Sequence, residues 1–206
     1  LISLTACKKD DNCLPPEEKV VFMPLSIGNY WVYENVEIDT LGNETKIGGL
    51  DSLVIERDTV INGNTYYVVE GINAWYNPVW EYMYSLRDSS GYIVSERGKI
   101  FFALEDFDKV IRNDSYFSGS GINDTVMSIS FQMKEVSNSI NVPAGIFNNV
   151  LNFEGDLYKY SPTIGVPSHR IMRNYYVEDV GRILETNYFS HSPTIFEKRL
   201  LRYHVE

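Results

Sequence analysis

Apolar and polar residues alternate with a period of two along most of the chain from about residue 20 onward. The clearest case is the stretch 125–134. Its apolar positions are Met127, Ile129, Phe131 and Met133, and its polar positions are Ser128, Ser130, Gln132 and Lys134. A strand with this pattern buries one face and leaves the other face to water. The alternation therefore predicts a mainly β, antiparallel protein.

Turn residues divide the alternating pattern into short strands. Asn62-Gly63 lies between two β-rich runs, and this dipeptide supplies the positive φ angles that a tight hairpin requires. Ser90-Gly91 and Arg97-Gly98 bracket a further short run. About a dozen strands are expected, which is more than one flat sheet holds comfortably. We predict a single antiparallel sheet that curls into an open or closed barrel, with a two-layer β-sandwich as the alternative.

Two stretches depart from simple alternation. Residues 30–33 are apolar on both faces, which is typical of a central strand. Residues 103–113 are the one candidate for a helix. Since no linker, repeat or shift of composition divides residues 20–206, we predict that they form a single β domain.

An apolar run at the start of the sequence ends at Cys7. Leu4-Thr5-Ala6-Cys7 resembles the bacterial lipobox, in which an aliphatic residue and two small residues precede a lipid-modified cysteine. The resemblance implies that residues 1–6 are the remnant of a signal peptide and that Cys7 becomes a lipidated N-terminus. Several acyl chains hold a protein firmly on a bilayer. The membrane is therefore an expected partner through Cys7.

Charged residues follow this cysteine at once. Lys8-Lys9-Asp10-Asp11 is similar to the surface-export tag of Bacteroidetes-type lipoproteins. The similarity implies an outer-membrane location, at the cell surface or, as the alternative, at the periplasmic face. Residues 7–19 are then a lipidated N-terminus and a flexible tether, because polar, acidic and proline residues dominate them. Cys13 lies in this tether, as an unpaired thiol or as a partner for another molecule.

Three further motifs carry a family resemblance. The stretches 23–34 (MPLSIGNYWVYE), 142–154 (VPAGIFNNVLNFE) and 177–189 (VEDVGRILETNYF) resemble strands of small Bacteroidetes-type surface lipoproteins of unassigned function. The motifs look structural: Gly28-Asn29 would turn the chain into the first strand, and Gly181 would sit at a tight corner. The resemblance implies a curved antiparallel sheet, and it carries no activity with it.

Charge and composition limit the function classes. The chain has 206 residues, of which 44% are hydrophobic, so it has ample material for a core. Its 18 Lys and Arg are outnumbered by 28 Asp and Glu, giving a net charge of -10. Nucleic-acid binding requires clustered basic residues. We therefore expect no nucleic-acid partner.

Motifs for catalysis and metal binding do not emerge from the sequence. The three histidines are far apart, at His169, His191 and His204, and no HExxH, CxxC or G-x-S-x-G pattern occurs. The acidic run of Glu105, Asp106 and Asp108 is interpreted as a solvated turn in preference to a catalytic pair or a calcium site. We predict a protein that is not an enzyme and that has no metal or cofactor.

Aromatic residues are abundant, with 15 Tyr, 10 Phe and 3 Trp. One stretch concentrates five of them: Trp75, Tyr76, Trp80, Tyr82 and Tyr84. Strand alternation would place the last three on one face, which could stack on sugars or line an apolar cavity. The interpretation we favour is a core layer, with Trp80 buried. Trp75, Tyr76 and Trp80 are the tentative ligand-binding residues.

These observations predict a lipid-anchored outer-membrane surface protein with a non-catalytic binding or assembly role. The alternative is a carrier of a lipid or other apolar ligand in a barrel cavity. A module that binds a neutral glycan, and a hydrolase, rank after these two. A carrier requires a void of a few hundred Å³ that large side chains do not fill, and candidates for filling it are Tyr82, Phe102 and Phe131.

Overall fold

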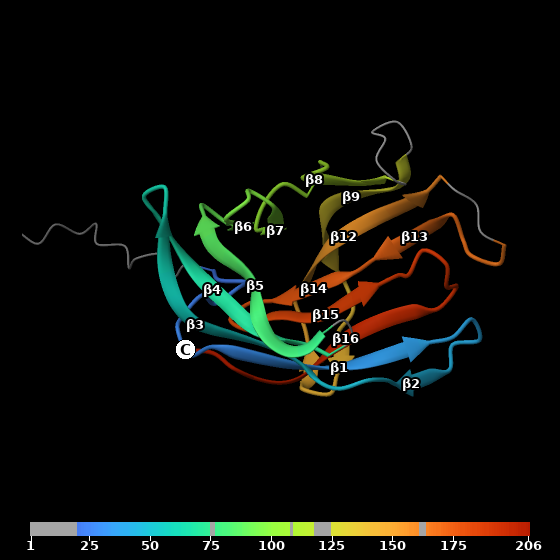
Figure 1. Ribbon diagram of the computed structural model, residues 1–206, viewed down its shortest axis with the longest axis horizontal. Helices are drawn as coiled ribbons and strands as arrows, with labels where there is room; N and C mark the ends of the chain where they lie inside the picture. Colours follow the sequence, from blue (N-terminus) through green and yellow to red (C-terminus); the bar gives the residue numbers. More distant parts are fainter. Residues whose placement is uncertain (1–19, 75–76, 108, 118–124, 161–163) are drawn as a thin grey trace, which may run out of the picture.

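The computed structural model describes residues 20–74, 77–107, 109–117, 125–160 and 164–206. These residues form strands, turns and bends without a helix. Most of the strands belong to one antiparallel sheet that curls into a barrel (Figure 1). The predicted curled sheet is confirmed, and the sandwich alternative is not adopted.

Two meanders make up the sheet. The first contains β1 (Tyr30–Ile38), β3 (Asp51–Ile61), β4 (Asn64–Asn73), β5 (Asn77–Ser89), β6 (Tyr92–Ser95) and β7 (Ile100–Ala103). The second contains β8 (Arg112–Phe117), β9 (Thr125–Val136), β12 (Val150–Lys159), β14 (Asn174–Val177), β15 (Gly181–Asn187) and β16 (Ile195–His204). A ladder between β1 and β16 joins the two meanders.

Four shorter strands complete the fold. β2 (Glu44–Lys46) pairs with β1, and β13 (His169–Met172) pairs with β12. β10 (Ile140–Val142) and β11 (Gly145–Phe147) form a separate hairpin. This hairpin is tied to the barrel by a hydrogen bond from the Ala144 amide to the Leu200 carbonyl, at 2.9 Å.

The edge strands β7 and β8 lie close together but remain unpaired. In the described part of the chain, no backbone ladder joins them. Side chains bridge the seam, because Arg112 Nη1 donates a hydrogen bond to the Ile100 carbonyl and Lys99 Nζ lies 3.4 Å from Asp114 Oδ2. The barrel is therefore nearly closed, with one seam held by side chains.

The alternation in the sequence corresponds to the two faces of the sheet. On β9, Ile129, Phe131 and Met133 are buried in the core. The β3–β4 hairpin turns at Asn62 and Gly63, whose φ angles are 50° and 77°, as the predicted tight turn requires. Trp31 and Tyr33 are both buried, so β1 is central, as expected.

The helix expected over residues 103–113 is wrong. Ala103 ends β7 and Arg112 begins β8. Between them, the Leu104 amide donates to the Gly91 carbonyl across a neighbouring turn. Asp106 has a φ angle of 74°, which a right-handed helix does not allow. Local pairing with the β5–β6 turn thus replaces helical hydrogen bonds.

One end of the barrel is packed with apolar side chains. Trp31 is completely buried there, and its Nε1 donates to the Val180 carbonyl at 2.6 Å. Phe22, from the segment before β1, stacks on Phe102 with 5.1 Å between ring centres. Gly181 has a φ angle of 97°, and a Cβ atom at this position would lie 3.2 Å from Trp31 Nε1. The predicted tight corner at Gly181 is therefore present.

Candidate functional site

The opposite half of the barrel interior is polar. Arg112 and Asp114 on β8 pair with the buried Phe131 and Ile129 on β9. Directly paired residues of two strands share one face of the sheet. Both charged side chains therefore point into the barrel. Lys198 on β16 reaches the same interior.

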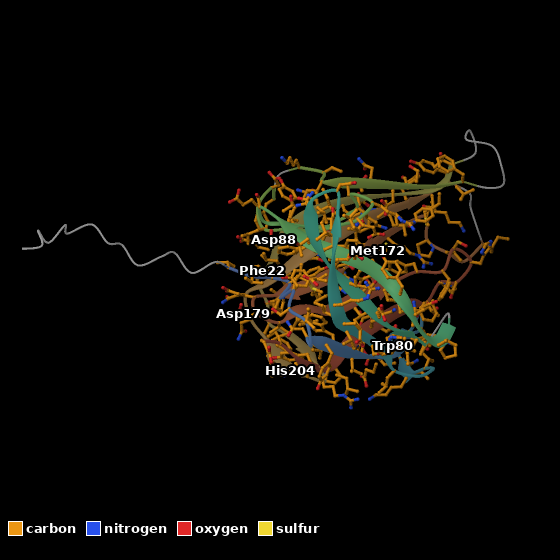
Figure 2. The ribbon with its side chains drawn as sticks, turned by 60° about the vertical axis from the view of Figure 1, so that its left-hand side comes forward. Phe22, Trp80, Asp88, Met172, Asp179 and His204 are labelled. Carbon is orange, nitrogen blue, oxygen red and sulfur yellow. The ribbon has the colours of Figure 1, made fainter. Side chains whose placement is uncertain are left out.

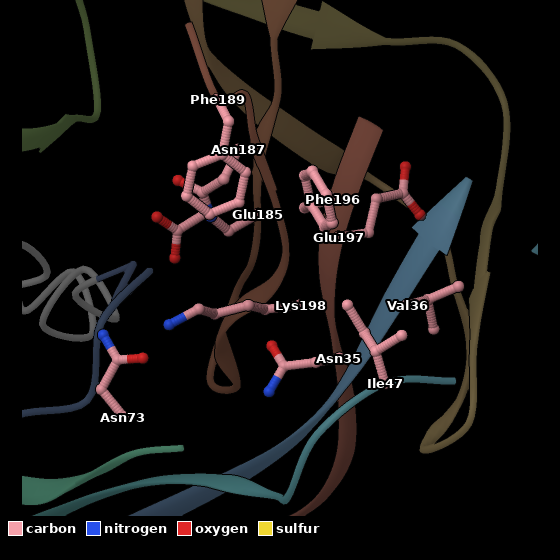
Figure 3. A pocket seen from close by; sticks show the side chains of 10 residues that line it. All are labelled: Asn35, Val36, Ile47, Asn73, Glu185, Asn187, Phe189, Phe196, Glu197 and Lys198. Atoms are coloured by element: carbon pink, nitrogen blue, oxygen red, sulfur yellow. The ribbon is translucent and has the colours of Figure 1, made fainter. Parts of the chain in front are cut away.

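Two adjoining cavities occupy this polar half. The first has a volume of about 220 Å³, and its walls include Asn35, Asn73, Asn187, Lys198, Phe189 and Phe196 (Figure 3). The second has a volume of about 190 Å³, and its walls include Arg112, Asp114, Arg182, Asn174, Tyr176 and Phe101. Glu185 and Asn187 line both. These two side chains therefore form the boundary that the cavities share.

Asp51 organises the wall of the first cavity. It follows the inward alternation of Ile55 and Leu53 on β3, and it is 3% exposed. Its Oδ2 forms an ion pair with Lys198, while its Oδ1 accepts hydrogen bonds from Asn35 Nδ2 and the Ala74 amide, each at 2.9 Å. One buried carboxylate thus holds a lysine, an amide and the end of β4 in place.

Arg182 and Glu185 form a second, partly buried ion pair, with 3.0 Å between Arg182 Nη2 and Glu185 Oε2. Residues three apart on a regular strand face opposite sides. In β15, however, Ile183 is an extra residue, since Tyr175 pairs with Leu184 and Tyr176 pairs with Arg182. This bulge turns both charged side chains toward the interior.

Buried tyrosines surround Arg182. The Tyr33 hydroxyl donates to the Arg182 carbonyl at 2.9 Å, and the Tyr176 hydroxyl donates to the Phe101 carbonyl at 3.1 Å. Burial raises the pKa of Tyr176 to about 12, and it also raises the pKa values of Tyr33 and Tyr84. These hydroxyls therefore stay protonated at neutral pH, and those of Tyr33 and Tyr176 act as hydrogen-bond donors.

Burial alone would lower the pKa of Arg182. The carboxylate of Glu185 and the neighbouring tyrosines oppose this effect and raise the pKa of Arg182 well above its usual value. Its guanidinium therefore carries its positive charge at neutral pH.

Arg112 lies where the second cavity meets the seam. Its guanidinium carbon lies 3.7 Å from the centre of the Phe131 ring, and Phe131 stacks on Phe153 at 5.0 Å. Its Nε lies 3.2 Å from Asp114 Oδ1. Burial lowers the pKa of Arg112, and the negative charge of Asp114 opposes this effect only in part. The cation is thus held by an aromatic face on one side and by a carboxylate on the other.

The residues that the sequence nominated lie elsewhere or outside the description. Cys7, Trp75 and Tyr76 are not among the described residues. Trp80 is 44% exposed on the outer face, and its Nε1 donates to Glu70 Oε2 at 3.3 Å. Figure 2 shows Trp80 well apart from Phe22, which lies at the left of the folded part in this view.

The expected core layer of aromatic residues on β5 is wrong for two of its three members. Trp80 and Tyr82 are 44% and 48% exposed, whereas Tyr84 packs against the core. The physical reason is a bulge at Met83, because Val69 pairs with Tyr84 but Glu70 pairs with Tyr82. The extra residue reverses the alternation, so Tyr82 and Tyr84 face opposite sides.

The acidic run after β7 lies in a turn. Asp106 accepts a hydrogen bond from the Tyr92 hydroxyl, and its Oδ1 lies 2.9 Å from Lys109 Nζ. Glu105 is exposed, and Asp108 lies outside the description. Among the described residues, no group of three His, Cys, Asp or Glu side chains is arranged to hold a metal ion.

Sequence reasoning missed the charged residues of the interior. Asp51, Arg182, Glu185 and Lys198 were not singled out, although a signal existed for two of them. Lys198 is two residues from both Phe196 and Leu200, so alternation places all three on the same face of the strand. Asp51 is two residues from Leu53 and shares its face in the same way. Charged residues at core positions of a strand indicate a polar interior. The bulge at Ile183, which brings Arg182 to Glu185, has no comparable signal.

A third hollow, of about 370 Å³, lies at the packed end of the barrel. Its polar walls include Asp88, Asp179, Glu206 and Thr65, all of which are exposed. The segment 21–26, together with Tyr67 and Arg87, contributes the remaining wall. Its carboxylates at Asp88, Asp179 and Glu206 are exposed, whereas Asp51 in the polar half is buried, so this hollow is the less enclosed of the candidate sites.

Comparisons with known proteins inform the fold. No family model and no curated protein match the chain. A protein from Bacteroides fragilis, described as inferred to be exported and as having a YmcC-like fold, matches with a TM-score of 0.52 at 12% identity. The match covers 90% of this chain and 100% of that one. At this identity the likeness concerns the fold alone, and it agrees with the barrel described above.

A second solved structure is more distant. It is an inferred lipoprotein from Parabacteroides distasonis, with a TM-score of 0.48, 12% identity, and coverage of 91% of this chain and 100% of that one. The lipobox, export-tag and strand motifs stay predictions, because neither neighbour tests them. In the described ranges, no helix has the length and apolar character needed to cross a bilayer.

Proposed function

We propose that this protein is a lipid-anchored outer-membrane surface protein that binds a small polar ligand in the polar half of its barrel, without catalysing a reaction. The observation that carries the proposal is the pair of adjoining cavities of about 220 and 190 Å³ that share Glu185 and Asn187. Concave sites with a few converging polar groups are typical of ligand binding.

The state of the ionisable groups favours binding over catalysis. Arg182 is paired with Glu185, and Lys198 is paired with Asp51. General acid–base catalysis works best with a pKa close to the operating pH. Burial moves the pKa values of Tyr33, Tyr84 and Tyr176 upward, away from that range. These groups suit fixed hydrogen bonding better than proton transfer.

The charged walls count against the alternative of an apolar carrier. Phe102 and Phe131 are buried and occupy the interior, as a filled barrel requires, although Tyr82 lies outside. The remaining space is lined by Arg182, Glu185 and Lys198. An acyl chain there would remove water from these charges without offering hydrogen bonds, which costs several kcal/mol. A polar ligand avoids this cost.

A second candidate function is favoured by the outer face of β5. Trp80 and Tyr82 are each nearly half exposed there. Exposed aromatic rings on a sheet can stack on the apolar faces of sugars. Binding of a neutral glycan at this outer face, with the adjoining Trp75 and Tyr76 as the residues that the sequence nominated, is therefore kept as the competing proposal.

The anchor is tested separately from the ligand. Cys7→Ala in the full-length gene, expressed in a Bacteroidetes host, should move the protein from the membrane fraction to the soluble fraction. Cys13→Ala is the matched control and should leave the protein on the membrane. Unchanged membrane partition of Cys7→Ala would rule out the lipid anchor. Protease accessibility on whole cells then distinguishes the cell surface from the periplasmic face.

The ligand site is tested by thermal-shift screening of the purified β domain against small polar metabolites. A true ligand should raise the melting temperature of the wild type and of Trp80→Ala, but not that of Asn187→Leu. Asn187 lines both cavities, whereas Trp80 lies on the outer face. Stabilisation that survives Asn187→Leu and disappears in Trp80→Ala would overturn the interior site in favour of the outer face.

A further inference from the structure

Three asparagines line the first cavity: Asn35, Asn73 and Asn187. An amide side chain offers two N–H donors and a carbonyl acceptor. Both donors of Asn35 are already used, since its Nδ2 lies 3.1 Å from the Gly49 carbonyl and 2.9 Å from Asp51 Oδ1. The side chain of Asn35 is therefore held in place by these two hydrogen bonds, and only its Oδ1 is left to accept a hydrogen bond from a ligand.

Asn73 supplies a buried acceptor in the same wall. Its Oδ1 is buried and has no hydrogen-bond partner among the described residues. A buried carbonyl oxygen left unsatisfied costs about 1–3 kcal/mol, so such groups are rare in folded proteins. Figure 3 shows the side chains of Asn73, Lys198 and Glu185 directed toward a common space. A hydroxyl group placed in this space could donate to Asn73.

Charged groups around the cavity are balanced before any ligand arrives. Lys198 pairs with Asp51, and Glu185 pairs with Arg182 through its Oε2. Lys198 carries three N–H donors, and a carboxylate accepts several hydrogen bonds. Each group therefore has hydrogen-bonding capacity beyond its ion pair. A charged ligand would compete with these pairs, whereas a neutral ligand with several hydroxyls would complement them.

Apolar side chains complete the enclosure. Phe189 and Phe196 meet edge to face, with 4.8 Å between ring centres and an interplanar angle of 81°. Ile47 lies in the same wall. Aromatic rings of this kind contact the C–H faces of a sugar while amides bind its hydroxyls. The first cavity thus combines donors, acceptors and an aromatic surface.

The geometry points to a single neutral sugar ring as the ligand of this first cavity, an inference that rests on the proposed binding function. Ligand pockets commonly measure about 300–1,000 Å³. A space of about 220 Å³ falls below that range, so it accommodates one ring, as a free sugar or as the end of a glycan. Asn73 accepts from a ring hydroxyl, Lys198 donates, and Phe196 packs against the ring carbons.

The test is isothermal titration calorimetry of the β domain with methyl glycosides of neutral hexoses and N-acetylhexosamines. Glucuronate, free amino acids and inorganic phosphate serve as charged probes. Asn73→Leu should weaken the binding of the preferred glycoside at least tenfold and leave the melting temperature unchanged or raised, because it removes an unsatisfied buried carbonyl. A purely structural role for Asn73 would instead lower the melting temperature. Asn141→Leu, at an exposed position of β10 outside both cavities, is the matched control and should bind normally. Trp80→Ala tests the outer face in the same assay.

Other outcomes separate the failure of this inference from that of the proposed function. Binding of a charged probe in place of the glycosides, with loss in Asn187→Leu, would overturn the sugar ring and leave the binding site standing. Glycoside binding that Asn73→Leu retains and Trp80→Ala loses would transfer the sugar to the outer face. If neither neutral nor charged probes bind, the interior binding site itself is overturned.

Discussion

The two halves of the barrel interior are built from the same strands but with opposite chemistry. Along β1, the inward positions pass from Trp31 through Tyr33 to Asn35, and thus from an indole to a phenol to an amide. Along β16 they pass from Leu200 to Lys198. One end of the barrel is therefore a dry core, and the other is a charged site on a rigid frame.

The energetic roles of the two halves differ accordingly. Burial of large apolar side chains is the main favourable term in folding. Buried ion pairs contribute little net stability, because desolvation offsets their attraction. The packed half therefore accounts for the stability of the barrel. The pairs formed by Asp51 and by Arg182 are better explained by function, as the hypothesis of a binding site requires.

The largest effect is expected from the packed half. Trp31 is completely buried and hydrogen-bonded to Val180. Trp31→Ala should lower the free energy of unfolding by about 3–5 kcal/mol, which urea denaturation measures. A loss below about 1 kcal/mol would show that this half does not dominate the stability.

A smaller effect is expected when a buried ion pair of the polar half is broken. Asp51→Ala removes the ion-pair partner of Lys198 and the acceptor that the Asn35 side chain and the Ala74 amide share. It should lower the free energy of unfolding by about 2–3 kcal/mol. Adding Lys198→Met should recover part of that loss, because the uncompensated charge is removed. A double variant less stable than Asp51→Ala alone would contradict this view of the pair.

The buried tyrosines of the polar half should also make the protein less stable at high pH. Burial raises the pKa of Tyr176 to about 12, above the ordinary tyrosine value of about 10. Its contribution to stability is therefore complete below about pH 10 and is lost as the pH rises through 12. The free energy of unfolding, measured against pH, should therefore fall above pH 10. Tyr176→Phe should make this decline shallower, whereas Tyr82→Phe, at an exposed position, should not.

The smallest effect is expected at Trp80. Because its ring is 44% exposed on the outer face, Trp80→Ala should change the free energy of unfolding by about 1 kcal/mol or less. Trp31→Ala and Trp80→Ala remove the same side chain, so the difference between their unfolding free energies in one denaturation assay measures the effect of burial. A loss of several kcal/mol of unfolding free energy would instead show that Trp80 is buried in the core, as the sequence predicted.

The fold was largely predictable because alternation and turn chemistry act locally. Asn62-Gly63 specifies its hairpin turn, and the inward face of β9 follows directly from its apolar positions. Which face Trp80 and Tyr82 occupy, on the N-terminal side of the bulge at Met83, could not be predicted. The bulge arises from the pairing of β5 with β4, and no sequence pattern indicates it. One extra residue moved Trp80 and Tyr82 from the expected core to the surface.

The candidate site was less accessible to sequence reasoning. Lys198 and Asp51 occupy inward positions of their strands, so their phase could have indicated a polar interior. Their mutual contact depends on strands far apart in the sequence. Arg182 meets Glu185 only because Ile183 bulges, and the cavity beside Asn73 depends on the curvature of the whole sheet. Such features arise from tertiary pairing.

The ladder between β1 and β16 has a consequence for the order of folding. It joins Tyr30 to His204, whereas each meander grows from hairpins between neighbouring segments. Local pairs form quickly, and contacts of large sequence separation form slowly because they close long loops. The first meander can assemble strand by strand, with β1 paired to β3 and β2, but the opposite edge of β1 has no partner until β16 pairs with it. We therefore expect the joining of the two meanders along β1 and β16 to be a late step of folding.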